Sequence, residues 1–398
     1  MVRFIRTFFS CQRRNDMIYL DNSATTQPFE RVIAKMDDVM RNEYYNVSAA
    51  YAAAMHQEQA VNLARKNLLG SLGMPKGRAI MTAGGTESDN LAILGFAETL
   101  HEPAVFLVSR LEHPAVLRTL ERVERMGHEI RYLPVDREGR IDVAASESLM
   151  DERVAMLICM QVNNETGAVQ PVGELIAALR KRAKRARVHV DGVQGYMRVP
   201  ISLSKLGVDS YAISAHKIHG PKGIGCLVTA PDFPMKTQMS GGGQEAGFRS
   251  GTLNSPGILG MSEAVSEMTE RGTEALWARK QTLVSCLYGH KGIFFNGPDP
   301  LDMEKSAPHI LSVRFDGVRG EVMRNALEGE NILVSTGSAC GSHKQKVSAT
   351  LTEMGLGTEE ADGTIRVSQG MMNTEDEMRT AAEAMIRLYD VLSRYRRR

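Results

Sequence analysis

An acid and an amine stand out in the stretch 188–225, which contains VHVDGVQG and SAHKIHGPKGIG. Asp191 follows one short, β-branched apolar run, and Lys217 follows a second. Such runs, bounded by glycine or polar residues, favour buried strands of an α/β sheet, and these sheets bind ligands where strands end. Pyridoxal phosphate needs a lysine that forms a Schiff base and a carboxylate that keeps its ring nitrogen protonated. The pair therefore predicts a pyridoxal-phosphate site.

Each residue alone also has an ordinary interpretation. A lysine near a strand end is most often a solvated surface residue, and an aspartate there is often only a helix cap. Ser214 and His216, however, place two phosphate-type donors beside Lys217. Lys222 is the rival amine, but its Pro-Lys-Gly context predicts an exposed turn. We therefore identify Lys217 as the reactive amine.

The composition of the 398-residue chain is typical of a soluble globular protein, with 43% hydrophobic and 24% charged residues. The net charge of +1 indicates neither a nucleic-acid nor a membrane partner, and no apolar run is long enough to span a membrane. Five widely spaced cysteines form neither a disulfide framework nor a zinc pattern, which favours a reducing compartment and no metal.

Residues 1–16 are basic, and their only acid is Asp16. A short organelle-targeting segment is one interpretation. A disordered lead-in, with the folded part opening at Met17, is the one we favour, and with it a cytoplasmic location.

Strands and helices alternate along the first two thirds of the chain. At residues 79–90, AIMTAGGTESDN predicts a strand, a glycine turn and a helix start near Thr86, where backbone amides attract an anion. Continued alternation predicts a mostly parallel sheet with helices on both faces, in a large domain over 17–270. The pattern changes beyond it, which predicts a smaller α+β domain over 271–398. GGGQEA, at 241–246, fits a dinucleotide fingerprint but lacks a preceding strand, so we reject that interpretation.

Several of these motifs together resemble the cysteine desulfurases, which are fold type I enzymes of the class V pyridoxal-phosphate aminotransferase family. The motifs are YLDNSATT, TAGGTESDNLAI, EHPAV, VNNETGAVQP, HVDGVQ, SAHKIHGPKGIG, GGGQEAGFRSGT, STGSACGS and IRVS. They extend from Met17 to Gly370 and cover most of the chain. The resemblance implies a large cofactor-binding domain and a small C-terminal domain that carries a catalytic cysteine loop.

The resemblance also implies roles for individual residues around the cofactor. Lys217 would form the Schiff base and move the Cα proton, Asp191 would pair with the ring nitrogen, and Gln194 would bind the ring oxygen. His113 would stack on the ring and could carry protons. Thr86, Ser214 and His216 would hold the phosphate. Thr252 would reach the phosphate of the neighbouring subunit, which implies a homodimer with shared sites.

Arg366 would bind the substrate carboxylate through two parallel hydrogen bonds, and Asn164 would assist at that carboxylate or at the ring oxygen. An arginine inside the strand-like TIRVS is costly to bury without a partner, so the sequence itself also indicates an anion. An internal salt bridge is the structural alternative.

Cys340 lies among small residues in STGSACGS, which predicts a mobile, exposed loop. By the resemblance, its thiolate would take sulfur from L-cysteine, release L-alanine and hold a persulfide for an acceptor such as an iron–sulfur scaffold or a tRNA-thiolation protein. The other four cysteines appear structural in this interpretation, because Cys159 and Cys226 lie in apolar strands, Cys286 in a helix and Cys11 in the N-terminal segment.

Two positions depart from the family pattern, namely Asn22 in LDNSATT and the pair Gly192-Val193 between Asp191 and Gln194. Neither removes a catalytic group, so they put substrate fine-tuning in question rather than the chemistry. Two rival functions stay open at this point. One is a selenocysteine lyase or another class V relative, and Cys340 argues against a plain transaminase. The other is a non-catalytic scaffold, which would show no absorbance from a cofactor held by Lys217.

Overall fold

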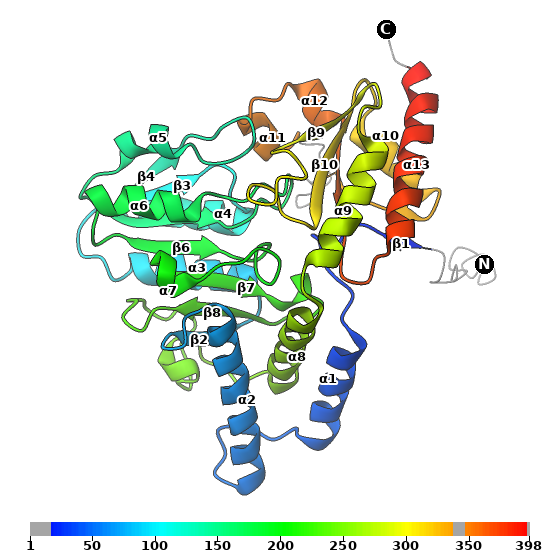
Figure 1. Cartoon of the computed structure of the whole chain (residues 1–398). Coiled ribbons are helices and arrows are strands. Elements are labelled where there is room, and N and C mark those ends of the chain that lie inside the picture. The colour runs from blue at the N-terminus through cyan, green and yellow to red at the C-terminus, as the bar shows by residue number, and fades with distance from the viewer. Residues whose placement is uncertain (1–16, 337–346, 396–398) are drawn as a thin grey trace, which may run out of the picture.

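A seven-stranded sheet forms the centre of the protein, and a three-stranded sheet lies beside it under the C-terminal helices (Figure 1). The structure, a computed structural model, describes residues 17–336 and 347–395. In spatial order the large sheet consists of β2 (Arg78–Thr82), β8 (Gly225–Thr229), β7 (Ser210–Ser214), β6 (Arg187–Asp191), β5 (Val154–Met160), β3 (Val105–Ser109) and β4 (Glu129–Leu133).

All strands of the large sheet run in one direction except β8, which is antiparallel to both of its neighbours. Only residues 215–224 connect β7 to β8, and a parallel crossover needs a dozen or more residues. The other six strands therefore end at one edge of the sheet. This arrangement confirms the predicted mostly parallel sheet.

Helices cover both faces of the large sheet because its side chains alternate between two apolar clusters. On β3, Val105 and Leu107 belong to one cluster, whereas Phe106 and Val108 belong to the other. The first cluster is covered by α2 (Ala52–Ser71), α6 (Val172–Arg182) and α8 (Ser255–Arg271), and the second by α3 (Gly85–Ala97) and α4 (Pro114–Arg125). α1 (Glu30–Asn42) packs against α8.

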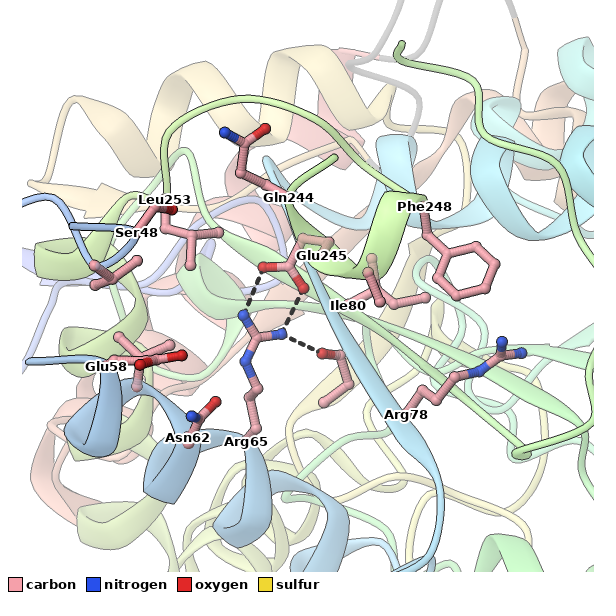
Figure 2. Close-up of a pocket in the computed structure, with 14 residues that line it drawn as sticks. Ser48, Glu58, Asn62, Arg65, Arg78, Ile80, Gln244, Glu245, Phe248 and Leu253 are labelled. Carbon is pink, nitrogen blue, oxygen red and sulfur yellow. Dashed lines mark hydrogen bonds and ion pairs between the residues drawn. The ribbon is translucent and has the colours of Figure 1, made fainter. Parts of the chain in front are cut away.

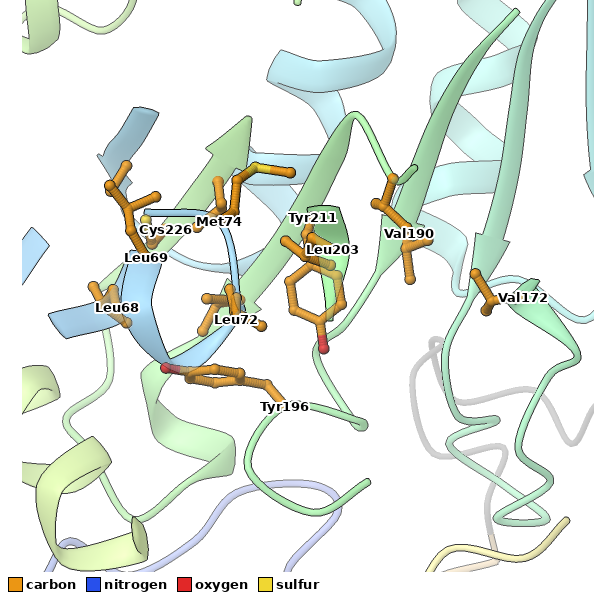
Figure 3. Close-up of a cluster of buried hydrophobic side chains, with 14 of the residues drawn as sticks. Leu68, Leu69, Leu72, Met74, Val172, Val190, Tyr196, Leu203, Tyr211 and Cys226 are labelled. Carbon is orange, nitrogen blue, oxygen red and sulfur yellow. The ribbon is translucent and has the colours of Figure 1, made fainter. Parts of the chain in front are cut away.

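Tyr196 and Tyr211 fill the first cluster below the loop that follows β6 (Figure 3). Their ring centroids are 6.4 Å apart in an edge-to-face arrangement. Leu72 and Leu203 pack around them, and Val190, which immediately precedes Asp191, belongs to the same cluster. The end of β6 therefore rests on closely packed side chains.

The three-stranded sheet is antiparallel and has its own core. It contains β9 (Ile293–Asn296), β10 (Ile310–Phe315) and β12 (Thr364–Ser368), with β10 in the middle. Its apolar cluster draws on α9 (Glu274–Leu287), α10 (Gly320–Glu328) and α13 (Glu375–Leu392). β9 is absent from the elements expected from the sequence.

The first described residues join the two parts. β1 (Ile18–Tyr19) pairs with β11 (Ile332–Leu333), and Leu20 lies in the small sheet's core. The chain then crosses to the large sheet before α1 begins. Two short helices, α11 (Ala349–Glu353) and α12 (Thr358–Asp362), and the short α5 (Val143–Ser146) and α7 (Leu203–Leu206) complete the α-helices of the described residues. None of the helices in the described part is both long and apolar enough to cross a membrane.

Candidate active site

Three of the predicted site residues meet at the edge where the parallel strands end. Asp191 is the last residue of β6, Lys217 lies on a short 3₁₀ turn directly after β7, and His113 caps α4 after β3. His113 and Lys217 both lower the pKa of the Asp191 carboxyl, as positive groups at the same edge of the sheet do. The topology has therefore assembled residues that are distant in the sequence.

The amine of Lys217 is held by the polar loop that follows β1. Its Nζ donates to the carbonyl oxygens of Ser23 at 2.5 Å and Ala24 at 2.8 Å. Gln194 Nε2 donates to the same Ser23 oxygen at 2.9 Å. Lys217 and Gln194 thus converge on one backbone carbonyl, which the motif LDNSATT supplies.

Asp191 is a buried carboxylate, only 6% exposed. Burial raises the pKa of this carboxyl, whereas the Val193 N–H, which donates to Oδ1 at 2.9 Å, and the neighbouring His113 and Lys217 lower it. No salt bridge to Asp191 is formed by any described residue. A protonated ring nitrogen would supply the missing positive partner.

His113 presents a neutral imidazole to the site. Its Nδ1 accepts the Ala115 N–H at 3.1 Å, which leaves the proton of the neutral ring on Nε2. Burial lowers the pKa of His113, and Lys217 lowers it further, while Asp191 raises it. The adjacent Glu112 is fully buried, and burial raises its pKa to about 8. Glu112 is therefore mostly protonated at neutral pH and adds little negative charge near Asp191.

The predicted phosphate cup is a cleft of about 720 Å³ between the start of α3 and the end of β7. Its lining includes Gly85, Thr86, Ser214 and His216, as the sequence predicted. A Cβ on Gly85 would lie 2.5 Å from Val193 Cγ2, so glycine is required there for close packing. The free amides at the N-terminus of α3 favour an anion in this cleft.

His216 is uncharged at neutral pH, because burial and the cations Lys217 and Lys222 lower its pKa to about 4. Its Nδ1 lies 3.1 Å from Thr25 Oγ1. Lys222 is exposed, as its turn context predicted, and lies on the rim of the same cleft. Lys222 therefore supplies a charged donor at the rim of the cleft, whereas His216 contributes a neutral N–H.

Arg366 occupies the middle of β12 and is 6% exposed. Its Nη2 forms a 2.7 Å ion pair with Asp21 Oδ1, and its Nη1 donates to the Asn164 carbonyl at 2.9 Å. Nε is buried and has no hydrogen-bond partner among the described residues. The salt-bridge alternative raised by the sequence is thus present here, and Asn164 contacts Arg366 through its backbone.

Two predicted site residues remain, Thr252 and Cys340. Thr252 lies in an exposed loop and does not line the cleft. Cys340, like Cys11, falls outside the described residues. Cys159 and Cys226 are buried in β5 and β8, as expected, and burial raises the pKa of both thiols.

Gly192 and Asn22 depart from the family pattern for structural reasons. A Cβ on Gly192 would lie 1.9 Å from Tyr211 Cζ, so this glycine accommodates the tyrosine ring. The Tyr211 hydroxyl donates to Gln161 Oε1 at 2.5 Å. The Asn22 side chain donates to the carbonyl oxygens of Tyr19 and Ser368 at 3.0 and 3.1 Å. Gly192 therefore shapes the floor of the site, and Asn22 fastens the loop to β12.

The sequence interpretation missed two buried bases behind the site. Arg198 is 3% exposed, donates to the Lys217 carbonyl and has no acidic partner among the described residues. His309 Nε2 lies 3.3 Å from Gln194 Oε1. Neither residue belongs to a motif that marks it, because each contributes through a contact between distant segments.

A second hollow, lined by Arg65 and Glu245, lies at α2 and the loop before α8 (Figure 2). Two short contacts join the Arg65 guanidinium to the Glu245 carboxylate, and Arg65 also donates to the Ala79 carbonyl at 2.7 Å. The charges of Arg65 and Glu245 are therefore already paired with each other. Among the described residues, no group of three acids, histidines or cysteines could hold a metal ion.

The residues at the strand ends fit pyridoxal phosphate. An amine, a buried carboxylate that forms no salt bridge with a described residue, a neutral imidazole and a glycine-lined anion cleft are the groups that this cofactor requires. Lys217, Asp191, Gln194 and His113 would surround the ring, and Thr86, Ser214 and His216 would hold the phosphate.

Comparison with known proteins gives a consistent result. The aminotransferase class-V family profile matches residues 18–380. The chain is 38% identical to the cysteine desulfurase IscS of Escherichia coli strain K12 / DH10B over 373 residues, which cover 91% of this chain and 90% of that protein.

Solved structures agree. A NifS-like protein is 34% identical, with a TM-score of 0.86, and the match covers 94% of this chain and all of that one. SspA, solved in complex with cysteine, is 29% identical, with a TM-score of 0.78, 90% coverage of this chain and full coverage of its own.

Proposed function

Since the chain belongs to the aminotransferase class-V family, we infer that it is a pyridoxal-phosphate-dependent cysteine desulfurase. It converts L-cysteine to L-alanine. The observation that carries this inference is the convergence of Lys217 Nζ and Gln194 Nε2 on the Ser23 carbonyl beside the buried Asp191. The similarity to IscS and to NifS-like proteins selects cysteine as the substrate.

The bound cofactor supplies an electron sink that stabilises negative charge at the substrate Cα. In our proposal Asp191 holds the proton of the ring nitrogen, Gln194 donates to the ring oxygen and His113 covers a ring face. Lys217 provides the amine that anchors the cofactor and the base that moves the Cα proton. Arg198 donates to the Lys217 carbonyl and so helps to fix the backbone that carries this amine.

Arg366 and Asn164 are proposed to position the substrate carboxylate. Arg366 is now paired with Asp21, so the substrate has to share or replace this ion pair. The Nε of Arg366 has no partner among the described residues, so it is a further donor for the substrate carboxylate. A planar guanidinium suits this role because it can hold both oxygens of one carboxylate.

Cys340 is proposed to receive the sulfur. Its thiolate attacks the sulfur of the substrate, the carbon–sulfur bond breaks, and the substrate carbon gains a proton. The products are L-alanine and a persulfide on Cys340, so no external oxidant or reductant is required. The persulfide then passes to a protein acceptor, such as an iron–sulfur scaffold or a tRNA-thiolation protein. A reducing cytoplasm suits this chemistry because the thiol has to be regenerated.

A homodimer with shared sites is also proposed. Large apolar side chains of α1, α2 and their connection are exposed: Met40, Tyr44, Tyr51, Met55 and Leu63 are each between 51% and 71% exposed. Such a patch indicates an interaction surface. A second subunit there would cover it, and its Thr252 would reach the phosphate of this site. Light scattering after size-exclusion chromatography is expected to give twice the mass of one chain.

The decisive experiment compares the wild-type chain with Cys340→Ala. With cysteine as substrate, the wild type is expected to release alanine and to gain one sulfur atom on Cys340 by mass spectrometry. Cys340→Ala should keep the visible absorption of bound cofactor but lose alanine release. Unchanged alanine release in this variant would rule out the desulfurase assignment and favour another class V activity.

A further inference from the structure

His309 is a buried histidine that links the small sheet to a proposed cofactor ligand. It immediately precedes β10, is 1% exposed, and its Nε2 lies 3.3 Å from Oε1 of Gln194. Its carbonyl accepts the Gln369 N–H at 3.0 Å, which fixes its backbone to the segment after β12. His309 therefore joins the three-stranded sheet to the loop after β6, which carries Gln194.

The surroundings of His309 determine which nitrogen carries its proton. The charged groups that act on it are Arg198, Lys280, Arg366 and Lys217, all of them cations. Together with burial they lower the pKa of His309 well below its usual value, so the ring is neutral. An amide oxygen can only accept a hydrogen bond, so the proton is on Nε2 and points to Gln194 Oε1. Nδ1 is buried, and no residue in the described part of the chain bonds to it.

This contact determines what the other end of Gln194 can do. With Oε1 held by His309, Nε2 faces the Ser23 carbonyl at 2.9 Å and uses one of its two hydrogens there. The second hydrogen is left for a further acceptor. In the reversed orientation the amide oxygen would face the Ser23 oxygen, which is repulsive. His309 would also have to move its proton to Nδ1, where no described residue accepts it.

We propose that His309 is a positioning residue that orients Gln194, so that the free amide hydrogen meets the ring oxygen of the cofactor. This inference rests on the proposed function. It assigns the small sheet a part in cofactor binding besides the handling of substrate. His309 touches neither the substrate nor the cofactor in this proposal and acts only through Gln194.

The test uses the full-length protein loaded with pyridoxal phosphate. His309→Phe keeps a ring but removes the donor, and His309→Gln restores an amide donor. We expect His309→Phe to shift the visible absorption band and to weaken cofactor binding about fivefold to tenfold, the value of one hydrogen bond. His309→Gln should restore both properties towards wild type. The control is His290→Phe, which alters a half-buried histidine just before β9 whose Nε2 lies 3.4 Å from Asp390 Oδ1.

A double-mutant cycle with Gln194→Leu separates positioning from general packing. If His309 acts through Gln194, His309→Phe should add nothing to the loss caused by Gln194→Leu. An unchanged spectrum and affinity in His309→Phe, or fully additive losses, would overturn the inference. If His309→Phe does not fold, His309→Met replaces it in the same comparison. A wild-type chain that binds no cofactor would instead refute the proposed function.

Discussion

The two sheets contribute to one site, but they hold their residues in different ways. On the large sheet, Asp191 is fixed by the N–H of Val193 and His113 by the N–H of Ala115, each only two residues away. On the small sheet, Arg366 is held by Asp21 and Asn164, which are 345 and 202 positions away. Asp191 and His113 on the cofactor side are therefore fixed locally, whereas Arg366 on the substrate side is fixed only when the two parts are packed together.

The polar loop after β1 contacts both parts of the protein directly. Asn22 N donates to the Ser368 carbonyl at 3.0 Å, while the Ser23 carbonyl accepts from Lys217 and Gln194. Neighbouring residues of one short segment thus contact both sheets. A change at Asp191 or His113 should mainly affect cofactor binding, and a change at Arg366 should mainly affect the use of substrate.

The largest effect is expected from Lys217→Ala on the large sheet. Loss of the amine removes both the covalent link to the cofactor and the base, so alanine release should fall by about 10²-fold to 10⁴-fold or more. Borohydride reduction followed by peptide mass spectrometry should find the cofactor on Lys217 in the wild type. Lys222→Ala, at the cleft rim, is the control and should keep this link. Cofactor trapped on Lys222 instead would show that the wrong amine has been identified.

A smaller and different effect is expected from Arg366→Lys on the small sheet. A lysine cannot form two parallel bonds, so kcat/KM for cysteine should fall by about 10-fold to 100-fold while the cofactor spectrum stays as in the wild type. Asp21→Asn removes the competing carboxylate and serves as the companion variant. The comparison between the two sheets fails if Arg366→Lys loses cofactor and substrate binding to the same degree.

Gly192→Ala tests the packing below the cofactor side. The new methyl group would overlap the Tyr211 ring and should lower the free energy of unfolding by about 1–3 kcal/mol, measured by urea denaturation. Adding Tyr211→Leu to Gly192→Ala should restore part of the lost free energy of unfolding, because the new methyl group and the tyrosine ring compete for the same space. Equal losses with and without Tyr211→Leu would mean that the glycine has another role.

The smallest effect is a gradual dependence of stability on pH, to which His219 contributes. The pKa of its imidazole falls from 6.5 to about 4, mainly because the ring is buried. The unfolded chain therefore binds this proton at a higher pH than the folded chain does, so the free energy of unfolding should fall as the pH drops from about 6.5 towards 4.

The hydrogen bonds of His219 agree, since its Nδ1 faces the Gln27 carbonyl and its Nε2 accepts the Met371 N–H. Glu112 acts in the opposite direction. Its raised pKa, about 8 in place of 4.5, weakens the fold as the pH rises between these values. Thermal melts of His219→Gln and Glu112→Gln across this range should flatten the acid and alkaline sides respectively. A profile that neither variant changes would contradict these assignments.

Local sequence was sufficient for much of the large sheet. The sequence pattern predicts strands over 129–133 and 154–160, and β4 and β5 have these bounds, because both runs are short and bounded by polar residues. β9 was not predicted, since only its pairing with β10 makes the segment 293–296 a strand. The pattern over 375–398 predicts one helix, but the α-helix ends at Leu392 and residues 393–395 form a 3₁₀ turn.

The sequence alone determined the alternation of strands and helices, the reactive amine and acid and the family resemblance, because these depend on residue type and on short spacings. Only the tertiary structure decided that Arg366 pairs with Asp21, that His309 faces Gln194 and that Gly192 makes room for Tyr211. Each of these is a contact between segments from different elements. Such contacts form when two packed surfaces meet, and no periodicity within either segment records them.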